Sequence, residues 1–352
     1  MPAMCPRRST IATFVAFLAV TVPLGAADSP GCSAGVAGLA SAATPGTSVD
    51  LELAHGGLIR SYRLHLPARF DGVAPAPLWL HVHGYTGSAR HSDGWTGLSE
   101  LSDREGFVLV LPQSTSFEAS LGPPGQSRNA TITSWNDLAC SAPLQPEAAA
   151  CREDADPYPC PPECGTCGRC NWCSCHDDVA YIAALIDHLA AELCIDTDRV
   201  FASGYSNGGM FVHRLGCALD DRLAAVAPMH GYLARGFNCA AGASGPSMLL
   251  VGGTADRTVP IDGSFASDGY IYTSQHGVAE EWAESQSCSA EPTAVETPWD
   301  GRRALSCVEH PGCAGDRAVR SCSWDGAHIW PRDDAGNFGG ELLWDFFSEA
   351  ER

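Results

Sequence analysis

The chain contains no lysine. All 21 of its basic residues are arginine, and 41 acidic residues leave a formal net charge of −20. The absence of lysine excludes a Schiff-base lysine, the lysine of a phosphate-binding P-loop and a Ser-x-x-Lys nucleophile pair. The acidic balance argues against a nucleic-acid partner, which would need a basic surface. Acidity of this kind instead helps to keep a protein in solution.

Long apolar stretches are scarce. The one extended run, at residues 11–22, is too short for a transmembrane helix. Arg7 and Arg8 precede this run, and small residues follow it at 25–27, a pattern typical of a signal peptide. We therefore expect residues 1–27 to be removed, the mature chain to be extracellular or periplasmic, and no segment to span a membrane.

Cysteine, in contrast, is abundant. Removal of Cys5 with the signal peptide leaves an even number of the 17 cysteines, which in an oxidising compartment predicts up to eight disulfides. Residues 140–175 hold eight of them in a proline-containing stretch that is too long for a plain connection. We expect a disulfide-rich insertion at about 138–175. The spacing from Cys164 to Cys173 also suits a metal–thiolate site, but disulfides are favoured in a secreted chain.

Hydrophobic patterns after residue 48 predict strands alternating with helices. Alternating apolar and polar residues on both sides of 55–57 predict an antiparallel hairpin at a sheet edge. Further strands are expected at 78–82, 107–111, 199–203, 223–228 and 248–251, and helices at 177–194, 208–219, 275–287 and 341–349. The alternation predicts an α/β catalytic domain at 48–352, with a mainly parallel sheet covered on both faces, after a flexible segment at 28–47.

The strongest chemical signal is the run GYSNG at residues 204–208, between an expected strand and an expected helix. A serine on a sharp strand-to-helix turn exposes its hydroxyl, and flanking glycines leave room for the strand and the helix. The helix N-terminus also favours developing negative charge. Ser206 is therefore the candidate nucleophile. The alternative is a glycine-rich turn with an idle serine.

A second signal is the run HVHGYTG at residues 81–87, directly after an expected strand. Acyl transfer needs backbone N–H donors aimed at the oxyanion of the tetrahedral intermediate. The backbone N–H groups of Tyr85 and Asn207 are the candidate donors. The alternative is an ordinary turn at the end of a strand.

An acid follows a later strand, in the run GGTAD at residues 252–256. In α/β-hydrolases the catalytic residues occur in the chain order Ser, acid, His. Asp256 fits that order, and Asp262 and Asp268 are rivals further into the same loop. The other possible role of Asp256 is to form the turn.

Three of the 12 histidines follow Asp256. His276 begins an expected helix and His310 lies in a segment bounded by cysteines, whereas His328 lies in a loop before the last helix, where the general base belongs. As the base, His328 would take the Ser206 proton and return it to the leaving alcohol, and Asp256 would hold its tautomer. Disulfides are expected to fix the region before this loop, through Cys288, Cys307, Cys313 and Cys322.

Several runs together resemble the secreted polyhydroxybutyrate-depolymerase and feruloyl-esterase-like family. They are CIDTDRV with ASGYSNGGM at 194–210, SWN at 134–136, HDDVAYI at 176–182, GTAD with Val259 and Pro260 at 253–260, and HIWP at 328–331. The similarity extends from about Ser48 to Phe347. It implies an α/β-hydrolase fold and a serine carboxylester hydrolase with Ser206, Asp256 and His328 as its triad.

The chain departs from the family pattern at two places near the expected substrate entrance. The long cysteine-rich insertion replaces a short cysteine-bearing loop, and the oxyanion turn carries Tyr85 and Thr86. Trp135 and Trp330 are candidates for the substrate cleft, since aromatic faces suit phenolic or polyester chains; packing is the alternative. No metal or cofactor is implied.

The sequence thus predicts a secreted serine esterase that works by two-step acyl transfer. Its substrate would be a polyhydroxyalkanoate-type polyester or a feruloyl or other acyl ester of plant polysaccharide. A peptidase, an acyltransferase and a non-catalytic secreted binding protein remain alternatives, and the oligomeric state is left open.

Overall fold

The computed structural model describes residues 28–34, 39, 43–121, 128–138, 150–155, 158–165, 167, 170, 172 and 174–352. The predicted signal peptide, along with Cys140 and Cys173 of the expected insertion, lies outside these residues. Within them, no helix combines the length and the apolar character that crossing a membrane would require.

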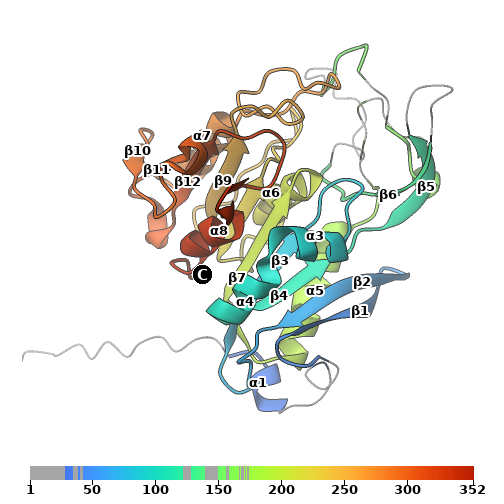
Figure 1. Cartoon of the computed structure of the whole chain (residues 1–352), viewed down its shortest axis with the longest axis vertical. Coiled ribbons are helices and arrows are strands. Elements are labelled where there is room, and N and C mark those ends of the chain that lie inside the picture. The colour runs from blue at the N-terminus through green and yellow to red at the C-terminus, as the bar shows by residue number, and fades with distance from the viewer. Residues whose placement is uncertain are drawn as a thin grey trace, which may run out of the picture.

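Ten of the described strands form one large sheet in the order β1-β2-β4-β3-β7-β8-β9-β12-β11-β10 (Figure 1). In this order their bounds are Thr47–His55, Leu58–Leu66, Val108–Pro112, Ala76–Val82, Ile195–Tyr205, Ala225–Met229, Ser247–Gly253, Val319–Trp324, Ser306–His310 and Thr293–Val295. All neighbours from β4 to β12 are parallel, and the pairs at both edges are antiparallel. The predicted, mainly parallel sheet with an edge hairpin is confirmed.

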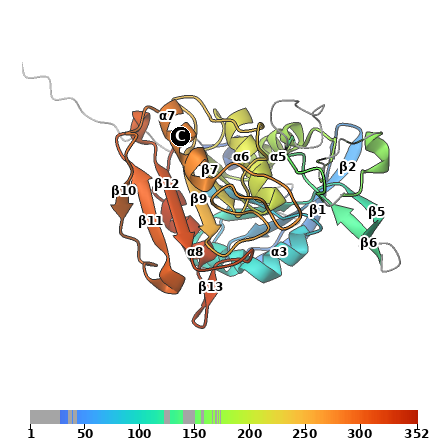
Figure 2. The ribbon, with the colours of Figure 1, turned by 90° about the horizontal axis from the view of Figure 1, so that it is seen from above.

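Helices cover both faces of the sheet, as predicted (Figure 2). One face carries α5 (Asp178–Glu192), α6 (Asn207–Ala218) and α7 (Gln275–Ser285), and the other carries α3 (Ala89–Thr96), α4 (Leu98–Glu105) and α8 (Gly339–Phe347). Side-chain caps fix where several begin: Asp177, Ser274 and Ser88 accept backbone N–H groups at the starts of α5, α7 and α3. The smaller elements are α1 (Gly31–Ala34), β5 (Ser116–Leu121), β6 (Arg128–Thr133), β13 (Arg332–Asp333), β14 (Gly336–Asn337), η1 (Pro162–Cys164), η2 (Arg302–Ala304) and η3 (Ala314–Asp316).

Each face of the sheet has its own apolar core. On the α5–α7 face, Tyr181, Leu185 and Leu189 of α5 are wholly buried, which accounts for the helical spacing in the sequence. On the opposite face, the ring of Phe201 from β7 stacks on that of Phe347 from α8 at 4.9 Å. Removal of a wholly buried aromatic side chain of this kind costs about 3–5 kcal/mol.

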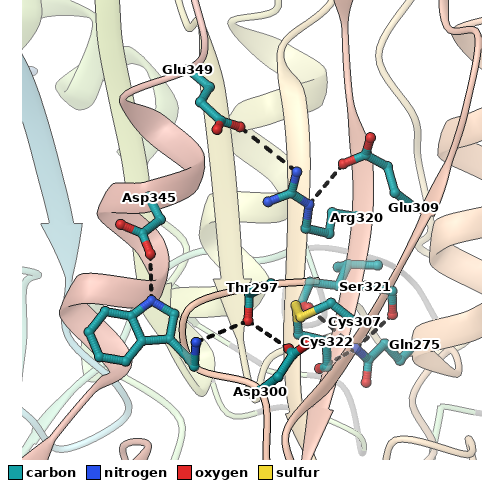
Figure 3. The surroundings of a disulfide bond; sticks show 12 residues. Gln275, Thr297, Asp300, Cys307, Glu309, Arg320, Ser321, Cys322, Asp345 and Glu349 are labelled. Atoms are coloured by element: carbon teal, nitrogen blue, oxygen red, sulfur yellow. Dashed lines mark hydrogen bonds and ion pairs between the residues drawn. A yellow bond between two sulfur atoms is a disulfide. The ribbon is translucent and has the colours of Figure 1, made fainter. Parts of the chain in front are cut away.

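The C-terminal strands β12, β11 and β10 extend the sheet as an antiparallel meander that was not predicted. Cys307 and Cys322, on directly paired positions of β11 and β12, form a disulfide. Arg320 of β12 forms ion pairs with Glu309 on the neighbouring strand β11 and with Glu349 near the end of the chain (Figure 3). The Cys307–Cys322 and Cys288–Cys313 bonds confirm the expected disulfides before the His328 loop.

The cysteine-rich segment is held by disulfides where the structure describes it. The bonds are Cys151–Cys170, Cys160–Cys167 and Cys164–Cys175. The thiols of Cys164, Cys167 and Cys170 are therefore not free to hold a metal ion, and the disulfide interpretation applies to them.

Two further disulfides were not assigned from the sequence. Cys217–Cys239 joins α6 to a later loop, and Cys32–Cys194 joins the N-terminal part of the chain to the start of β7. Ser29 is also buried and donates its hydroxyl to the Leu193 carbonyl at 2.7 Å. Residues 28–34, within the segment expected to be flexible, are thus fixed to the body of the protein.

Candidate active site

Ser206 lies on the sharp turn between β7 and α6. Its φ of 58° and ψ of −126° are unusual for a residue with a side chain, and such strain persists only where surrounding contacts enforce it. The flanking glycines allow the turn. A Cβ on Gly204 would lie 2.3 Å from the Gly208 carbonyl oxygen, and one on Gly208 would lie 2.3 Å from the Val82 carbonyl oxygen. The pattern in the sequence therefore reflects space that only glycine leaves open.

A chain of hydrogen bonds runs from Ser206 through His328 to Asp256. The Ser206 hydroxyl lies 2.9 Å from His328 Nε2, and His328 Nδ1 lies 2.8 Å from Asp256 Oδ2. Ser206 follows β7, Asp256 follows β9 and His328 follows β12. Because these strands are parallel, their carboxyl ends bring the three side chains to one edge of the sheet.

The rival acids and histidines make their hydrogen bonds and ion pairs to other residues. Asp262 accepts the backbone N–H of Ser264, and Asp268 accepts the hydroxyl of Tyr158 at 2.7 Å. His276 pairs with Glu280 on the exposed side of α7, while His310 Nδ1 bonds to the Ser289 carbonyl. Of the candidates from the sequence, the structure joins Ser206, His328 and Asp256 by hydrogen bonds, as expected.

The Asp256 carboxylate is buried but heavily hydrogen-bonded. Its Oδ1 accepts the backbone N–H groups of Thr258 and Val259 at 2.8 and 2.9 Å. Burial alone would raise the pKa of Asp256, but hydrogen bonds from two histidines and from the Val259 amide outweigh that effect and lower it below its ordinary value. The acid is therefore ionised and able to orient a histidine at any pH near neutrality.

The second of those histidines is His230, which the sequence analysis missed. His230 Nδ1 lies 2.7 Å from Asp256 Oδ2, the same oxygen that His328 contacts. A signal was present, because His230 follows directly after β8, the neighbour of both β7 and β9. A polar residue at the carboxyl end of a central parallel strand is a candidate for the site at that edge.

Tyr85 and Asn207, the predicted oxyanion-hole residues, both line a cavity of about 210 Å³ beside Ser206. Neither backbone N–H has an acceptor among the described residues, so both remain available to a ligand. The turn that carries Tyr85 is fixed by its neighbour, because the Thr86 N–H donates to the Thr133 carbonyl at 2.8 Å. The two amides therefore remain the candidate donors to an oxyanion.

The side chain of Asn207 holds a neighbouring loop in place. Its Oδ1 accepts the Trp135 N–H at 2.8 Å, and its Nδ2 donates to the Trp135 carbonyl and to Asp137 Oδ2 at 3.2 Å each. Asp137 Oδ2 also accepts the indole N–H of Trp172 at 2.7 Å. The SWN run and the Asn of GYSNG thus form one hydrogen-bonded unit next to Ser206.

Four tyrosine or tryptophan rings contribute to the wall of the cavity. Its lining comprises Tyr85, Tyr158, Trp172, Ser206, Asn207, Met210, Thr258, Val259, Asp268, Tyr272 and His328. Two of the rings, those of Tyr158 and Trp172, come from the cysteine-rich segment, and Tyr158 packs edge-on against Tyr85 at 5.4 Å. The insertion therefore supplies part of the wall beside the nucleophile.

Trp135 and Trp330 do not line this cavity, which corrects the expectation that they contact substrate. Both side chains are 0% exposed. Trp135 stacks on Phe211 at 5.1 Å and donates its indole N–H to the His83 carbonyl. Trp330 packs edge-on against His81 at 5.4 Å. Both rings therefore serve in packing, since each holds a loop of the site against the core.

Two groups of potential metal ligands occur among the described residues. In the first, His230, Asp256 and His328, nitrogen and oxygen are 2.7 and 2.8 Å apart, which is hydrogen-bond contact. In the second, the sulfurs of Cys217 and Cys239 are bonded to each other, so no thiolate is present. Neither group is arranged around an ion.

No family model matches the chain. Its sequence is similar to that of feruloyl esterase B from Piromyces equi, with 24% identity over 298 residues that cover 82% of this chain and 45% of that protein. It is also similar to feruloyl esterase C from Emericella nidulans, with 27% identity over 175 residues that cover 49% of this chain and 58% of that protein. The chain spans about half the length of these relatives.

The fold is similar to that of an acetyl xylan esterase from Aspergillus awamori. The TM-score is 0.54 at 13% sequence identity, and the match covers 86% of this chain and 100% of that chain. The chain thus has the α/β-hydrolase fold and is related in sequence to feruloyl esterases.

Proposed function

We propose that the chain is a secreted serine esterase that hydrolyses carboxylic esters with Ser206 as nucleophile, His328 as general base and Asp256 as the acid that orients it. The observation that carries this proposal is the hydrogen-bond chain from Ser206 Oγ through His328 to Asp256 Oδ2. Ser206 lies on a strained turn and lines a cavity. The relationship to feruloyl esterases supports the same reaction class.

In the first half of the reaction, His328 Nε2 accepts the Ser206 proton while Oγ attacks the ester carbonyl carbon. The backbone N–H groups of Tyr85 and Asn207 stabilise the oxyanion that forms. The same Nε2 proton then passes to the leaving alkoxide oxygen as the carbon–oxygen bond breaks. Asp256 holds the Nδ1–H tautomer of His328 throughout and stabilises its transient positive charge.

In the second half, a water molecule replaces the alcohol. His328 Nε2 takes a proton from this water, whose oxygen attacks the acyl carbon of the Ser206 ester. The tetrahedral intermediate collapses, the proton returns to Ser206 Oγ, and the carboxylic acid leaves. Each step uses one base and one pair of N–H donors.

The acyl group we propose is aromatic, of the feruloyl type esterified to plant polysaccharide. A phenolic ring matches a cavity of about 210 Å³ that is walled by Tyr85, Tyr158, Trp172 and Tyr272. The two feruloyl esterases similar in sequence support this choice. A polyhydroxyalkanoate offers no ring to these aromatic faces and is the second substrate class to test.

Secretion forms part of the proposal. Seven disulfides among the described residues suit an oxidising compartment, where small inserted segments depend on such bonds. The proposed catalytic domain runs from residue 48 to 352, with the cysteine-rich insertion at about 138–175. Expression should therefore use an oxidising compartment.

The test is a product-release assay with purified, disulfide-bonded protein. Methyl ferulate, acetylated xylan, polyhydroxybutyrate film and a peptide mixture are compared, with an alcohol acceptor added in a parallel series. We expect ferulate release to be fastest, no peptide cleavage, and no excess of transfer over hydrolysis. Release of hydroxybutyrate alone would contradict the aromatic substrate. Equal activity of Ser206→Ala on the best substrate would contradict the mechanism.

A further inference from the structure

We propose that His230 is a positioning residue for the acid of the triad, sharing the Asp256 carboxylate with His328 and holding it in line. This inference rests on the proposed function and extends it to a residue outside the trio. The two imidazoles approach Asp256 Oδ2 from different sides, at 2.7 Å for His230 Nδ1 and 2.8 Å for His328 Nδ1. Their ring planes are 86° apart, with centroids separated by 5.6 Å.

The hydrogen-bond partners of His230 set its protonation. The indole of Trp324 is a donor only, and its Nε1 lies 3.3 Å from His230 Nε2. His230 Nε2 must therefore be the unprotonated acceptor, which puts the proton on Nδ1 and directs it to Asp256. His230 is thus a neutral donor to the same oxygen that His328 uses.

The surroundings of His230 keep it neutral. The side chain is 0% exposed, and burial lowers its pKa by more than the hydrogen bond to Asp256 raises it. The ionisable groups that face it are Asp256 from the loop after β9, His328 from the loop after β12, and Tyr205 from β7, whose ring centroid lies 5.7 Å away. Asp256 favours a positive charge on His230 and His328 disfavours it, but burial has the largest effect and keeps the imidazole neutral.

The backbone at His230 is also specialised. Its φ is 48°, in the left-handed region that residues with side chains rarely adopt. The peptide is held there because the His230 N–H donates to the Val251 carbonyl at 2.9 Å. The next residue must be glycine, since a Cβ on Gly231 would lie 2.2 Å from the Ser206 carbonyl oxygen. Strain of this kind is typical of functional sites.

Two consequences follow for catalysis. First, Asp256 receives N–H groups on both oxygens, two on Oδ1 and two on Oδ2, so the carboxylate cannot rotate away from His328. Second, the oxygen that stabilises the His328 cation is shared with another donor. His328 must therefore approach that oxygen from the side that His230 leaves open.

Three variants separate these effects from loss of packing. His230→Gly removes the donor and suits a positive φ, while His230→Asn keeps a side-chain N–H near the position of Nδ1 and also tolerates positive φ. His213→Ala is the matched control, because His213 is another wholly buried neutral imidazole, bonded to the Cys239 carbonyl. The melting temperature, and kcat and KM on methyl ferulate, are measured from pH 4 to 9.

For His230→Gly we expect kcat to fall about tenfold with KM nearly unchanged, because Asp256 is no longer held in line with His328. His230→Asn should keep a kcat close to that of the wild type, and so should His213→Ala despite a lower melting temperature. An unchanged kcat in folded His230→Gly would overturn the inference alone. A wild-type protein without esterase activity would overturn the proposed function, and the inference with it.

A measurement on the wild-type protein needs no variant. The ¹⁵N chemical shifts of its histidine imidazoles should identify His230 as the Nδ1–H tautomer, unchanged from pH 8 to pH 5. A His230 signal of the Nε2–H tautomer, or one that titrates in this range, would overturn the inference whether or not His230→Gly folds.

Discussion

The indole N–H of Trp172 is hydrogen-bonded to Asp137 Oδ2 at 2.7 Å. The same oxygen accepts the side-chain N–H of Asn207 at 3.2 Å, so an aromatic wall of the cavity is tied to the residue that follows the nucleophile. Trp172 belongs to the cysteine-rich segment, whereas Asn207 belongs to the core of the fold. The proposed specificity wall and the turn of the proposed nucleophile are therefore joined through one carboxylate.

Replacement of Trp172 should change specificity more than basal activity. Trp172→Ala is expected to lower kcat/KM for methyl ferulate by about 10- to 100-fold, since a buried aromatic contact contributes about 1.5–3 kcal/mol. Hydrolysis of 4-nitrophenyl acetate, whose acyl group is small, should change by less than about threefold. The control is Trp299→Ala, because Trp299 is a partly buried tryptophan bonded to Asp345 of α8. Equal losses on both esters would contradict a specificity role.

Replacement of the Asn207 side chain tests the brace around the nucleophile. Asn207→Ala keeps the backbone N–H proposed for the oxyanion but removes the bonds to Trp135 and Asp137. We expect the free energy of unfolding to fall by about 1–3 kcal/mol, because the Trp135 N–H is left buried and unpaired. Denaturant unfolding measures this loss, and Asn337→Ala on the exposed β13–β14 hairpin is the control. Equal stabilities of the two variants would contradict the brace.

Acid should destabilise the fold through buried histidines. Burial lowers the pKa of His81 to about 3, and those of His83 and His213 to about 4, against about 6.5 in the unfolded chain. Below pH 6.5 the unfolded state therefore binds more protons than the folded state. The contribution of these histidines to the free energy of unfolding is fully present above pH 6.5. It is lost as the pH falls towards 4, by about 1.4 kcal/mol per pH unit for each histidine.

Denaturant unfolding at pH 7, 5.5 and 4.5 checks this dependence. His213→Ala should remove about one third of the pH dependence that the three histidines together produce. It should also lower the free energy of unfolding at pH 7. A free energy of unfolding that stays constant or rises between pH 6.5 and 4.5 would show that these histidines take up protons in the folded state.

Glycine positions around the nucleophile should be intolerant of any side chain. A Cβ on Gly231 would lie 2.2 Å from the Ser206 carbonyl oxygen, so Gly231→Ala must displace the turn or the loop after β8. We expect loss of esterase activity and a loss of stability of about 3 kcal/mol or more. Gly94→Ala in α3 is the control, because nothing lies within 4 Å of its Cβ and alanine favours helix. Wild-type activity in Gly231→Ala would contradict the described turn.

The sequence was sufficient to predict strands β1 to β4 and β7 to β9 of the main sheet, its edge hairpin and the grouping of Ser206, Asp256 and His328. Those features depend on local patterns and on chain order, since strands of a parallel sheet end at one edge. Trp135 and Trp330 were candidates for the substrate cleft because aromatic faces suit phenolic or polyester chains, with packing as the alternative. Whether such a ring faces the cavity or the core depends on tertiary packing that no local pattern contains.

His230 and the β10–β12 meander were missed for a similar reason. A histidine after a strand can be assigned to the site only when the order of the strands is known. His230 follows β8 and His328 follows β12, and these two strands are adjacent neither in sequence nor in the sheet. The strands of the meander are short and mix polar with apolar residues, so their period is weak. Their pairing is instead reinforced by a disulfide and by one ion pair between β11 and β12.

Covalent labelling of Ser206 tests the central claim most directly. The purified wild-type protein is treated with a fluorophosphonate and digested, and the modified residue is located by mass spectrometry while ferulate release is followed in the same sample. We predict a single adduct on Ser206 that forms in step with the loss of activity, and no adduct in Ser206→Ala. Full esterase activity with an unlabelled Ser206, or an adduct on another serine that tracks inactivation, would contradict the account.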